Sequence, residues 1–391
     1  MEQTLQDLTL RAPVSPAACA TEFTVNNREL LKELAELQKV VQRRATVPIL
    51  VNVLVQATGS VLVLTATDLD VSLRTTCHAR IKKEGTCTIP AHKLTEYVRL
   101  LEDGDVTIRL LENHWVQIRS GRSHTKMVGM APDSFPQLPL FPKDSSLRIE
   151  SHALRCLIDR TIFAVSTEES RYTLGGALLL LNPEGVTMVA TDGHRMAHAE
   201  YLKPQATKQE ARVLVPKKAL LELDALLSSF SAEHIVFAQD DSTLYFGIGS
   251  RLLTCRQIMG RFPNYESILP QGNANKVVVS RKDLFTAIQR VAQFSDAKSN
   301  CVRVKVAKNE IRVSSSNTET GESEDALQTA YTGPPKTIAF NSQYLLDFLR
   351  VVDCESVRLE FKDGESASEL KPEDTVSAEG TYRYLVMPLR G

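Results

Sequence analysis

Asp192, His194 and Arg195 lie within the segment VATDGHRMA, residues 189–197, which is otherwise apolar. A carboxylate, an imidazole and a guanidinium in one short stretch could serve as a general acid, a general base and an anion binder. His194 and His198 are also four residues apart, a spacing found in metal-binding pairs. The segment is therefore a catalytic cluster, a metal site or a turn.

The local pattern favours the turn. Asp192 and Gly193 stand between two alternating runs, and Asp-Gly is typical of a tight hairpin turn with a positive φ angle. On an alternating strand His194 and His198 share a face, but no Glu completes a His-Glu-x-x-His motif and no cysteine pair lies nearby. We expect no catalytic residue, no metal and no cofactor. An enzyme that uses Asp192, His194 and Arg195 is the rival hypothesis.

The composition is that of a globular protein, with 43% hydrophobic and 24% charged residues among 391. The net charge is −1, so any contact with nucleic acid needs basic residues that are gathered locally. Seven cysteines are scattered without a Cys-x-x-Cys pair, which indicates reduced, mostly buried thiols. No apolar run approaches the roughly 20 residues of a membrane helix, and the first residues lack the apolar core of a signal peptide. We expect a cytoplasmic protein.

The elements that must position the turn repeat along the chain. A short strand and an amphipathic helix begin each copy, alternating runs with turns follow, and a second strand-helix unit comes next. Asp68, Asp192 and Asn317 occupy corresponding places about 125 residues apart, a period that fits whole domains. The sequence predicts an α+β chain with an N-terminal extension and three copies of one domain: residues 1–20, 21–142, 143–271 and 272–391. The extension is either a disordered tail or a misassigned start.

Two of the predicted helices show their buried face in the sequence. Apolar residues recur every three or four positions, as expected for a single stripe that faces a core. These positions are Leu30, Leu34, Leu37 and Val41 in the first copy, and Leu284, Ile288 and Val291 in the third.

The VATDGHR hairpin, the segment RFPNYESILP and the C-terminal YLVMPLRG together resemble the β subunit of bacterial DNA polymerase III, the sliding clamp. The resemblance runs from about Phe23 to Gly391. It implies a homodimer of three-domain subunits that close head to tail into a ring around duplex DNA, with helices lining the hole and antiparallel sheets outside. It also implies a non-catalytic processivity factor, loaded by an ATP-driven partner, that slides without sequence specificity because it makes no base contacts.

The resemblance further implies an apolar cleft that binds short, extended peptides. Its partners would be the replicative polymerase α subunit, the clamp loader, and other polymerases and repair proteins, at micromolar affinity or about −8 kcal/mol. Met and aliphatic walls suit varied apolar side chains, and Arg, His and Asn suit polar groups of the peptide. The cleft residues implied are Leu174, Thr191, Gly193, His194, Arg195, Met196, Pro263, Ile268, Asn341, Tyr344, Leu385, Val386, Met387, Pro388, Leu389 and Arg390.

Basic residues on the predicted inner helices are the candidates for contacts with DNA phosphates. Interspersed acidic residues such as Glu29 and Glu33 leave open that these are ordinary solvated helix faces. Tyr172 stands where the family often has two adjacent tyrosines, since Thr173 replaces the second. The main candidates are Arg44, Tyr172, Lys217, Lys218, Lys32, Arg99, Arg155 and Lys282, and the further ones are Arg28, Lys39, Arg43, Lys93, Arg160, Arg281, Arg290 and Arg350.

Two alternatives keep the same domains. One is a monomeric adaptor with the same cleft but no ring, and the other is a specialised copy of the clamp that confers antibiotic resistance. Gln293 and Phe294, at the end of a predicted helix, are candidates for the interface of a dimer.

Overall fold

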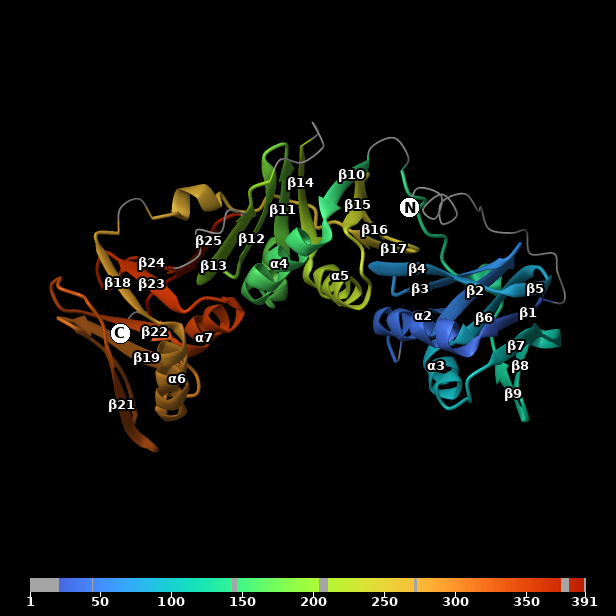
Figure 1. Cartoon of the computed structure of the whole chain (residues 1–391), viewed down its shortest axis with the longest axis horizontal. Helices are drawn as coiled ribbons and strands as arrows, with labels where there is room; N and C mark the ends of the chain where they lie inside the picture. The colour runs from blue at the N-terminus through green and yellow to red at the C-terminus, as the bar shows by residue number, and fades with distance from the viewer. Residues whose placement is uncertain are drawn as a thin grey trace. The chain divides into compact units, whose positions relative to one another are not determined.

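The computed structural model describes residues 21–43, 45–142, 146–203, 210–270, 273–373 and 380–389. The predicted extension, residues 1–20, lies outside them, as do Arg44 and Arg390. The chain divides into two compact units: Met1–Ser151 with Lys218–Gln257, and His152–Lys217 with Ile258–Gly391 (Figure 1). Each unit therefore contains part of the predicted middle domain.

The first unit contains two antiparallel sheets. The smaller sheet has the order β5 (Arg80–Lys83), β1 (Glu22–Asn26), β7 (Asp105–Leu110), β8 (Trp115–Ser120) and β9 (Ser123–Val128). The larger sheet has the order β10 (Ser146–Glu150), β15 (His234–Gln239), β16 (Thr243–Ile248), β17 (Arg251–Arg256), β4 (Val71–His78), β3 (Val61–Thr67), β2 (Asn52–Thr58) and β6 (Gly85–Pro90).

The larger sheet joins the first copy to the middle copy. Strand β17 pairs with β4, with Leu253 opposite Leu73, so the ladder runs without a break from one predicted domain into the next. Both leucines are buried. Because strand pairing satisfies backbone groups along the whole seam, this domain boundary is a continuous sheet.

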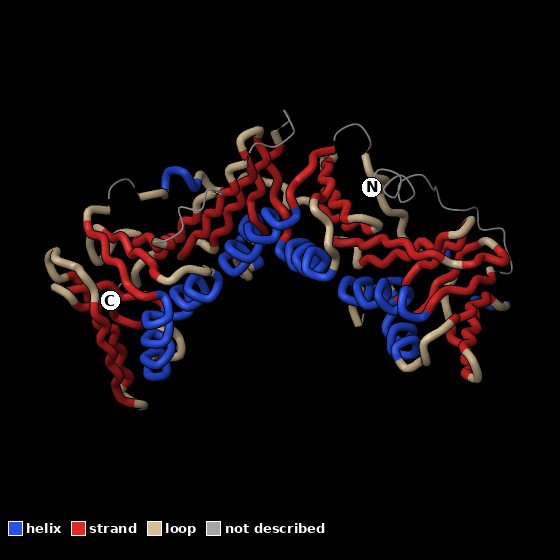
Figure 2. Tube along the Cα trace, viewed as in Figure 1, coloured by secondary structure: helices blue, strands red, loops and turns tan. Residues whose placement is uncertain are grey.

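Helices α2 (Asn27–Val40), α3 (Ala91–Arg99) and α5 (Lys217–Ser229) lie on one side of these sheets (Figure 2). Helix α2 begins where Asn26 accepts hydrogen bonds from the backbone of Arg28 and Glu29, which caps its first turn. The predicted stripe Leu30, Leu34 and Leu37 is buried, and Val41 is buried just beyond the last helical residue.

A buried ion pair ties α2 to β17. Arg251 is 0% exposed, and its Nε and Nη2 each lie 2.9 Å from the carboxylate of Glu33. Thr75 of β4 donates to the same carboxylate, and the Arg251 guanidinium lies 4.7 Å from the centre of the Phe230 ring. Both charges are thus compensated, which a buried ion pair requires.

The second unit also contains two antiparallel sheets. The larger has the order β14 (Ala211–Pro216), β11 (Gly176–Asn182), β12 (Gly185–Thr191), β13 (Arg195–Tyr201), β25 (Tyr382–Val386), β24 (Ser368–Pro372), β23 (Ser356–Phe361) and β18 (Asn275–Ser280). The smaller has the order β21 (Gly321–Gln328), β20 (Glu310–Asn317), β19 (Cys301–Ala307) and β22 (Lys336–Asn341).

Helices α4 (Ser151–Thr161), α6 (Arg281–Val291) and α7 (Ser342–Val351) again lie on one side of the sheets (Figure 2). Ser280 caps α6 by accepting from the backbone of Asp283, and Asn341 caps α7 by accepting from that of Gln343. The predicted stripe Leu284, Ile288 and Val291 is buried. The α+β fold of tandem domains is therefore confirmed, whereas the exact domain bounds stay a prediction.

Three of the six described cysteines are buried, whereas the sequence predicted that most would be. Cys77, Cys87 and Cys255 are buried, and burial raises the pKa of each thiol to about 12. Cys156, Cys301 and Cys354 are half-buried. No helix among the described residues is long and apolar enough to cross a membrane.

Candidate functional site

The segment that opened the sequence analysis is a hairpin turn between β12 and β13. The Asp192 carboxylate oxygen Oδ1 accepts from the backbone N–H groups of His194 (2.9 Å) and Arg195 (3.0 Å). The Thr191 hydroxyl donates to the carbonyl of Arg195 (2.6 Å) and accepts from the N–H of Gly193 (3.1 Å). The short side chains of Thr and Asp thus hold the turn by bonding to its own backbone.

Gly193 is required at the centre of this turn for two reasons. Its φ angle is 89°, which lies in the left-handed region that side chains disfavour. A Cβ atom there would also lie 2.6 Å from Nη1 of Arg171, which donates to the carbonyl of Asp192 across the turn (2.7 Å).

Arg195 is held by three separate segments of the second unit. Its Nε donates to Asp192 (2.9 Å), Nη1 to Asp347 of α7 (2.6 Å) and Nη2 to the carbonyl of Phe163 (2.6 Å), just after α4. The guanidinium also lies 4.4 Å from the centre of the Tyr344 ring. Only 10% of the side chain is exposed. These three bonds engage Nε, Nη1 and Nη2, so Arg195 supports the geometry of the turn.

An apolar cluster lies beside the turn and contains three of the predicted site residues: Leu174, Met196 of β13 and Leu385 of β25. Met196 and Leu385 face each other across the β13–β25 ladder, as do Arg195 and Val386. The 3₁₀ segments η5 (Glu169–Leu174) and η6 (Tyr265–Ile268) contribute Leu174 and Tyr265 to the same cluster. The buried members of the cluster are Leu174, Leu178, Val189, Met196, Leu214, Phe262, Tyr265 and Leu385, with Leu180, Ile258 and Leu269 packed against them.

Exposed side chains surround this cluster. His194 is exposed, and its carbonyl accepts from the N–H of Met387 (2.9 Å). Met387 and Ile268 are 43% and 47% exposed. The Leu389 N–H donates to Ala339 of β22 (2.8 Å), which fixes the path of the C-terminal segment through Pro388. Large apolar side chains are thus left open to solvent around a buried apolar floor, an arrangement suited to binding.

Three other predicted site residues, Asn341, Tyr344 and Pro263, form hydrogen bonds within the protein. The Asn341 side chain caps α7, and the carbonyl of Tyr344 accepts from the hydroxyl of the buried Tyr384 (2.9 Å). Burial raises the pKa of the Tyr344 and Tyr265 hydroxyls. Pro263 is exposed, and its carbonyl accepts from the N–H of Tyr265 (2.8 Å).

The two histidines do not share an environment, contrary to the expectation from strand alternation. His194 precedes β13 and is exposed, whereas His198 lies within β13 and is 5% exposed. The reason is that the turn ends only at Arg195, so the alternation of β13 begins after His194. No group of three or more His, Cys, Asp or Glu in the part of the chain that the structure describes is placed to hold a metal.

Several predicted DNA contacts already have partners within the protein. Lys218 bonds to the buried carboxylate of Asp68, and Lys32 lies 5.5 Å from the centre of the Phe230 ring. Lys217 donates to the carbonyl of Val165 at 3.5 Å. Burial, followed by the charge of Arg195, lowers its pKa. The lysines are therefore held in defined positions on the helix side of the sheets.

The other candidates are more open to solvent. Arg99, Arg155 and Lys282 are exposed on α3, α4 and α6. Tyr172 is 61% exposed, and a Cβ at Gly260 would lie 2.9 Å from its hydroxyl, which places Tyr172 against the loop after β17.

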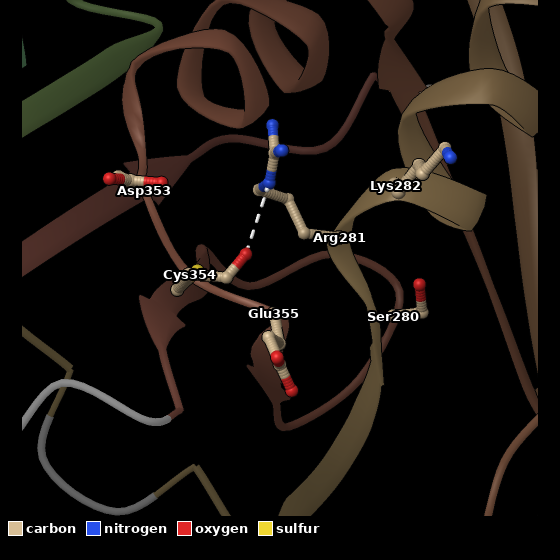
Figure 3. A pocket seen from close by; sticks show the side chains of 6 residues that line it. All are labelled: Ser280, Arg281, Lys282, Asp353, Cys354 and Glu355. Atoms are coloured by element: carbon tan, nitrogen blue, oxygen red, sulfur yellow. Dashed lines mark hydrogen bonds between the residues drawn. The ribbon is translucent and has the colours of Figure 1, made fainter.

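A cavity of about 530 Å³ lies at the start of α6 (Figure 3). It is lined by Ser280, Arg281, Lys282, Asp353, Cys354 and Glu355. Arg281 crosses it to donate to the carbonyls of Cys354 (3.1 Å) and Leu349 (3.0 Å). Its arginine thus braces α6 against the end of α7.

Sequence reasoning missed three residues of the site: Asp347, Phe163 and Arg171. All three reach the turn from distant segments, and their contacts depend on how helices pack on the sheet. The only sequence signal was for Asp347, which follows Tyr344 by three residues and so shares a helix face with it.

The fold and the site together define a three-domain scaffold with a candidate peptide-binding site. Residues 21–139, 148–264 and 266–390 match the N-terminal, central and C-terminal domains described as DNA polymerase III beta subunit. The chain therefore belongs to the DNA polymerase III beta subunit family, as its sequence motifs suggested.

Individual relatives agree over nearly the full length. The beta sliding clamp of Caulobacter vibrioides is 35% identical over 376 residues, covering 94% of this chain and 100% of the relative. That of Vibrio cholerae is 33% identical over 371 residues, with the same two shares. A crystal structure of the DNA polymerase III subunit beta from Pseudomonas aeruginosa has a TM-score of 0.89 at 33% identity, covering 95% of this chain and 100% of that one. The family is one of non-enzymatic processivity factors, which confirms that the chain is not an enzyme.

Proposed function

We propose that this chain is a sliding clamp, a processivity factor that encircles duplex DNA and tethers the replicative polymerase and other replication and repair proteins. Full-length membership in the beta subunit family carries this proposal. The activity needs no cofactor of its own, because the ATP-dependent work of opening and loading a ring belongs to the loader. A role on chromosomal DNA places the protein in the cytoplasm.

The helix side of each unit supplies the contacts with DNA. Arg99, Arg155 and Lys282 are exposed there, and Lys32, Lys217 and Lys218 are held close to neighbouring groups. Contacts of this kind reach phosphates and not base edges, so they attract the duplex without fixing a position on it. Tyr172 supplies an exposed ring beside this surface. The candidate Arg44 joins this set on the resemblance alone.

Partners bind at the turn between β12 and β13. The apolar floor of Leu174, Met196 and Leu385 receives apolar side chains of an extended peptide, with Met387 and Ile268 as adjustable walls. His194 offers an exposed imidazole at the rim. A short peptide buries little area, so affinity near micromolar, about −8 kcal/mol, allows the polymerase α subunit and the clamp loader to exchange.

Two edge strands give the dimer its interface. Strand β9 ends the five-stranded sheet of the first unit and β21 ends the four-stranded sheet of the second, so among the described strands neither has a partner on its outer edge. Strand β9 carries His124 and Lys126, whereas β21 carries Glu322, Glu324 and Asp325. A second copy would pair its β21 with β9 head to tail, by edge addition and charge complementarity. Phe294, next to β21, would pack at this seam.

The molecular mass in solution tests the ring against a monomeric adaptor. We expect light scattering to report twice 43.4 kDa, and Lys126→Pro in β9 to shift the protein toward the monomer, because the N–H of residue 126 faces the outer edge of the strand and proline cannot donate there. A wild-type monomer at micromolar concentration would contradict the ring.

Peptide binding tests the site. A fluorescent apolar peptide, selected once against the wild-type protein, should lose at least about tenfold in affinity on Met387→Glu, which places a charge against the apolar floor. Leu100→Glu is the matched control, since Leu100 is an exposed leucine at the end of α3. Equal affinities for the two variants would contradict the proposed site.

A further inference from the structure

One carboxylate connects the turn to the exposed Arg350 of α7. Asp347, whose side chain is 15% exposed, receives Nη1 of Arg195 on Oδ2 (2.6 Å) and Nη1 of Arg350 on Oδ1 (2.9 Å). Gln343, one turn earlier on α7, donates to Oδ1 as well. Arg195 is nearly buried, whereas the Arg350 side chain is 48% exposed. The same acid therefore serves a guanidinium of the candidate peptide site and a guanidinium of the helix surface.

We propose that Asp347 is a positioning residue that couples DNA on the helix surface to the affinity of the peptide site. The coupling rests on the proposed function, because it requires that the helix side meets DNA and that the turn binds peptides. It adds to that function a reason for the two events to depend on each other.

The first step runs from Asp347 to the turn. The Nε of Arg195 holds the Asp192 carboxylate, on which the backbone of the turn depends. The backbone carbonyl of the adjacent His194 receives the N–H of Met387. A change in how firmly Asp347 holds Arg195 is thus transmitted to the two exposed residues, His194 and Met387, that border the apolar floor.

The second step runs from DNA to Asp347. A phosphate competes for Arg350 because guanidinium groups form strong paired hydrogen bonds with phosphate oxygens. When Arg350 turns to a phosphate, Asp347 loses one of its two cationic partners. Its charge then acts on Arg195 alone, which strengthens that contact and stabilises the turn. The expected sign is that DNA raises peptide affinity.

Lys217 belongs to the same group of charges. The charge of Arg195 disfavours its ammonium form, while Asp192 and Asp347 favour it. The group thus contains the cations Arg195, Arg350 and Lys217 and the anions Asp192 and Asp347, and a phosphate at Arg350 draws one cation away from the anions. Linkage requires that peptide binding strengthen the hold on DNA by the same factor.

The test measures peptide affinity with and without DNA inside the protein. The selected fluorescent peptide is titrated into the free protein and into protein retained on closed circular duplex after the loader has been removed. We expect wild-type affinity to rise about threefold to tenfold on the DNA. Arg350→Gln should bind the peptide tightly in both states, and Asp347→Asn weakly in both. Neither variant should respond to DNA.

Arg80→Gln is the matched control. Arg80 on β5 is exposed and pairs with Asp105, so it shares the ion-paired character of Arg350 but contacts no part of the turn. Its DNA response should equal that of the wild type. Melting temperatures check that Asp347→Asn folds, and Arg350→Gln, a substitution at an exposed position, tests the proposal independently of that outcome.

Two results would overturn the coupling. The first is a wild-type response to DNA that survives in Arg350→Gln, and the second is no response in a wild-type protein that stays on circles and binds the peptide. In both cases the proposed function stands. Failure of the wild type to stay on circles or to bind the peptide would remove the proposed function and the coupling together.

Discussion

The turn at Thr67–Val71 in the first unit and the turn at Thr191–Arg195 in the second are built alike. In both, the threonine hydroxyl accepts from the backbone N–H of the second residue after it, at 3.0 Å in the first turn and 3.1 Å in the second. The same hydroxyl donates to the backbone carbonyl of the last residue of the turn. In both, the aspartate oxygen Oδ1 accepts from the last two N–H groups. The central residue has a positive φ in each, 81° at Leu69 and 89° at Gly193.

The turns differ in what their aspartates and last residues contact. Asp68 bonds to Lys218 of α5. The carbonyl of Asp70 accepts from the N–H of Arg256, which ends β17 and lies far from the C-terminus. Asp192 bonds to Arg195, and the carbonyl of His194 accepts from Met387 near the C-terminus. The last residue of the first turn, Val71, is apolar and buried, whereas the corresponding Arg195 bonds to Asp347 of α7. The backbone turn is therefore a shared scaffold, and the side chains after its aspartate decide what it can bind.

Of the variants at the two turns, Arg195→Ala should have the largest effect on stability and on peptide affinity. It leaves Asp192 and Asp347 without their main cation, and loss of one partner of a largely buried pair costs about 3 kcal/mol or more of unfolding free energy. Denaturant unfolding and peptide titration should both show large losses. Val71→Ala, at the corresponding position, should cost about 2 kcal/mol and leave peptide binding intact. Equal loss of peptide binding in both variants would show that the second turn has no special role.

Gly193→Ala tests whether the centres of the two turns are interchangeable. The left-handed φ and the short contact with Arg171 predict a loss of about 1–2 kcal/mol, visible as a lower melting temperature. Leu69→Gly should change stability by less than about 1 kcal/mol, since relief of the positive φ offsets the greater freedom of the unfolded chain. The account is wrong here if Gly193→Ala melts like the wild type.

Asp68→Asn tests whether the ion pair between Asp68 and Lys218 limits the affinity for duplex DNA. The amide oxygen still accepts from the turn, but Lys218 loses its anion and becomes available to a phosphate. Duplex affinity should rise a few-fold at low salt and converge with the wild type at high salt, since one more phosphate contact steepens the salt dependence. Lys218→Ala in the same background should remove the gain. Weaker binding by Asp68→Asn would mean that Asp68 positions Lys218 for DNA.

The smallest expected effect is on the pH dependence of the melting temperature, through His198 in the strand that follows the second turn. His198 in β13 occupies the place of Arg74 in β4, and burial lowers the pKa of His198 despite the nearby Glu200. Because its folded pKa lies below the unfolded value of about 6.5, stability is present above that pH and is lost as the pH falls through the folded pKa. The melting temperature should fall less from pH 7.5 to 5.5 in His198→Gln than in the wild type. An identical fall would exclude His198 as the cause.

Local chemistry made one part of the site predictable. Thr191, Asp192 and Gly193 form their turn through bonds within five residues, so the Asp-Gly pattern was sufficient. The helical stripes, such as Leu30, Leu34 and Leu37, were equally visible because a 3.6-residue period is a local property.

Contacts between distant segments were not predictable from patterns. Asp347 is far from Arg195 in sequence, and the packing of α7 against β25, the neighbour of β13, brings the two together. The sequence analysis assigned Arg195 to the peptide site, but its bonds to Asp347 and to the Phe163 carbonyl left no sign in the sequence. Leu69 gave no sign of a positive φ, because the bonds from Thr67 and Asp68 impose it on whichever residue follows. The joining of copies into continuous sheets at β4–β17 and β13–β25 was also invisible, since strand sequences do not name their partners.

The central claim is that the protein is held on DNA by encirclement, and retention on circular against linear plasmid tests it most directly. After loading with a clamp loader, the complexes are washed in high salt, which screens phosphate contacts but leaves a closed ring in place. The account predicts that the protein stays on circles and is lost when one cut linearises them. Equal loss from circles and linear DNA, with a competent loader, would contradict it.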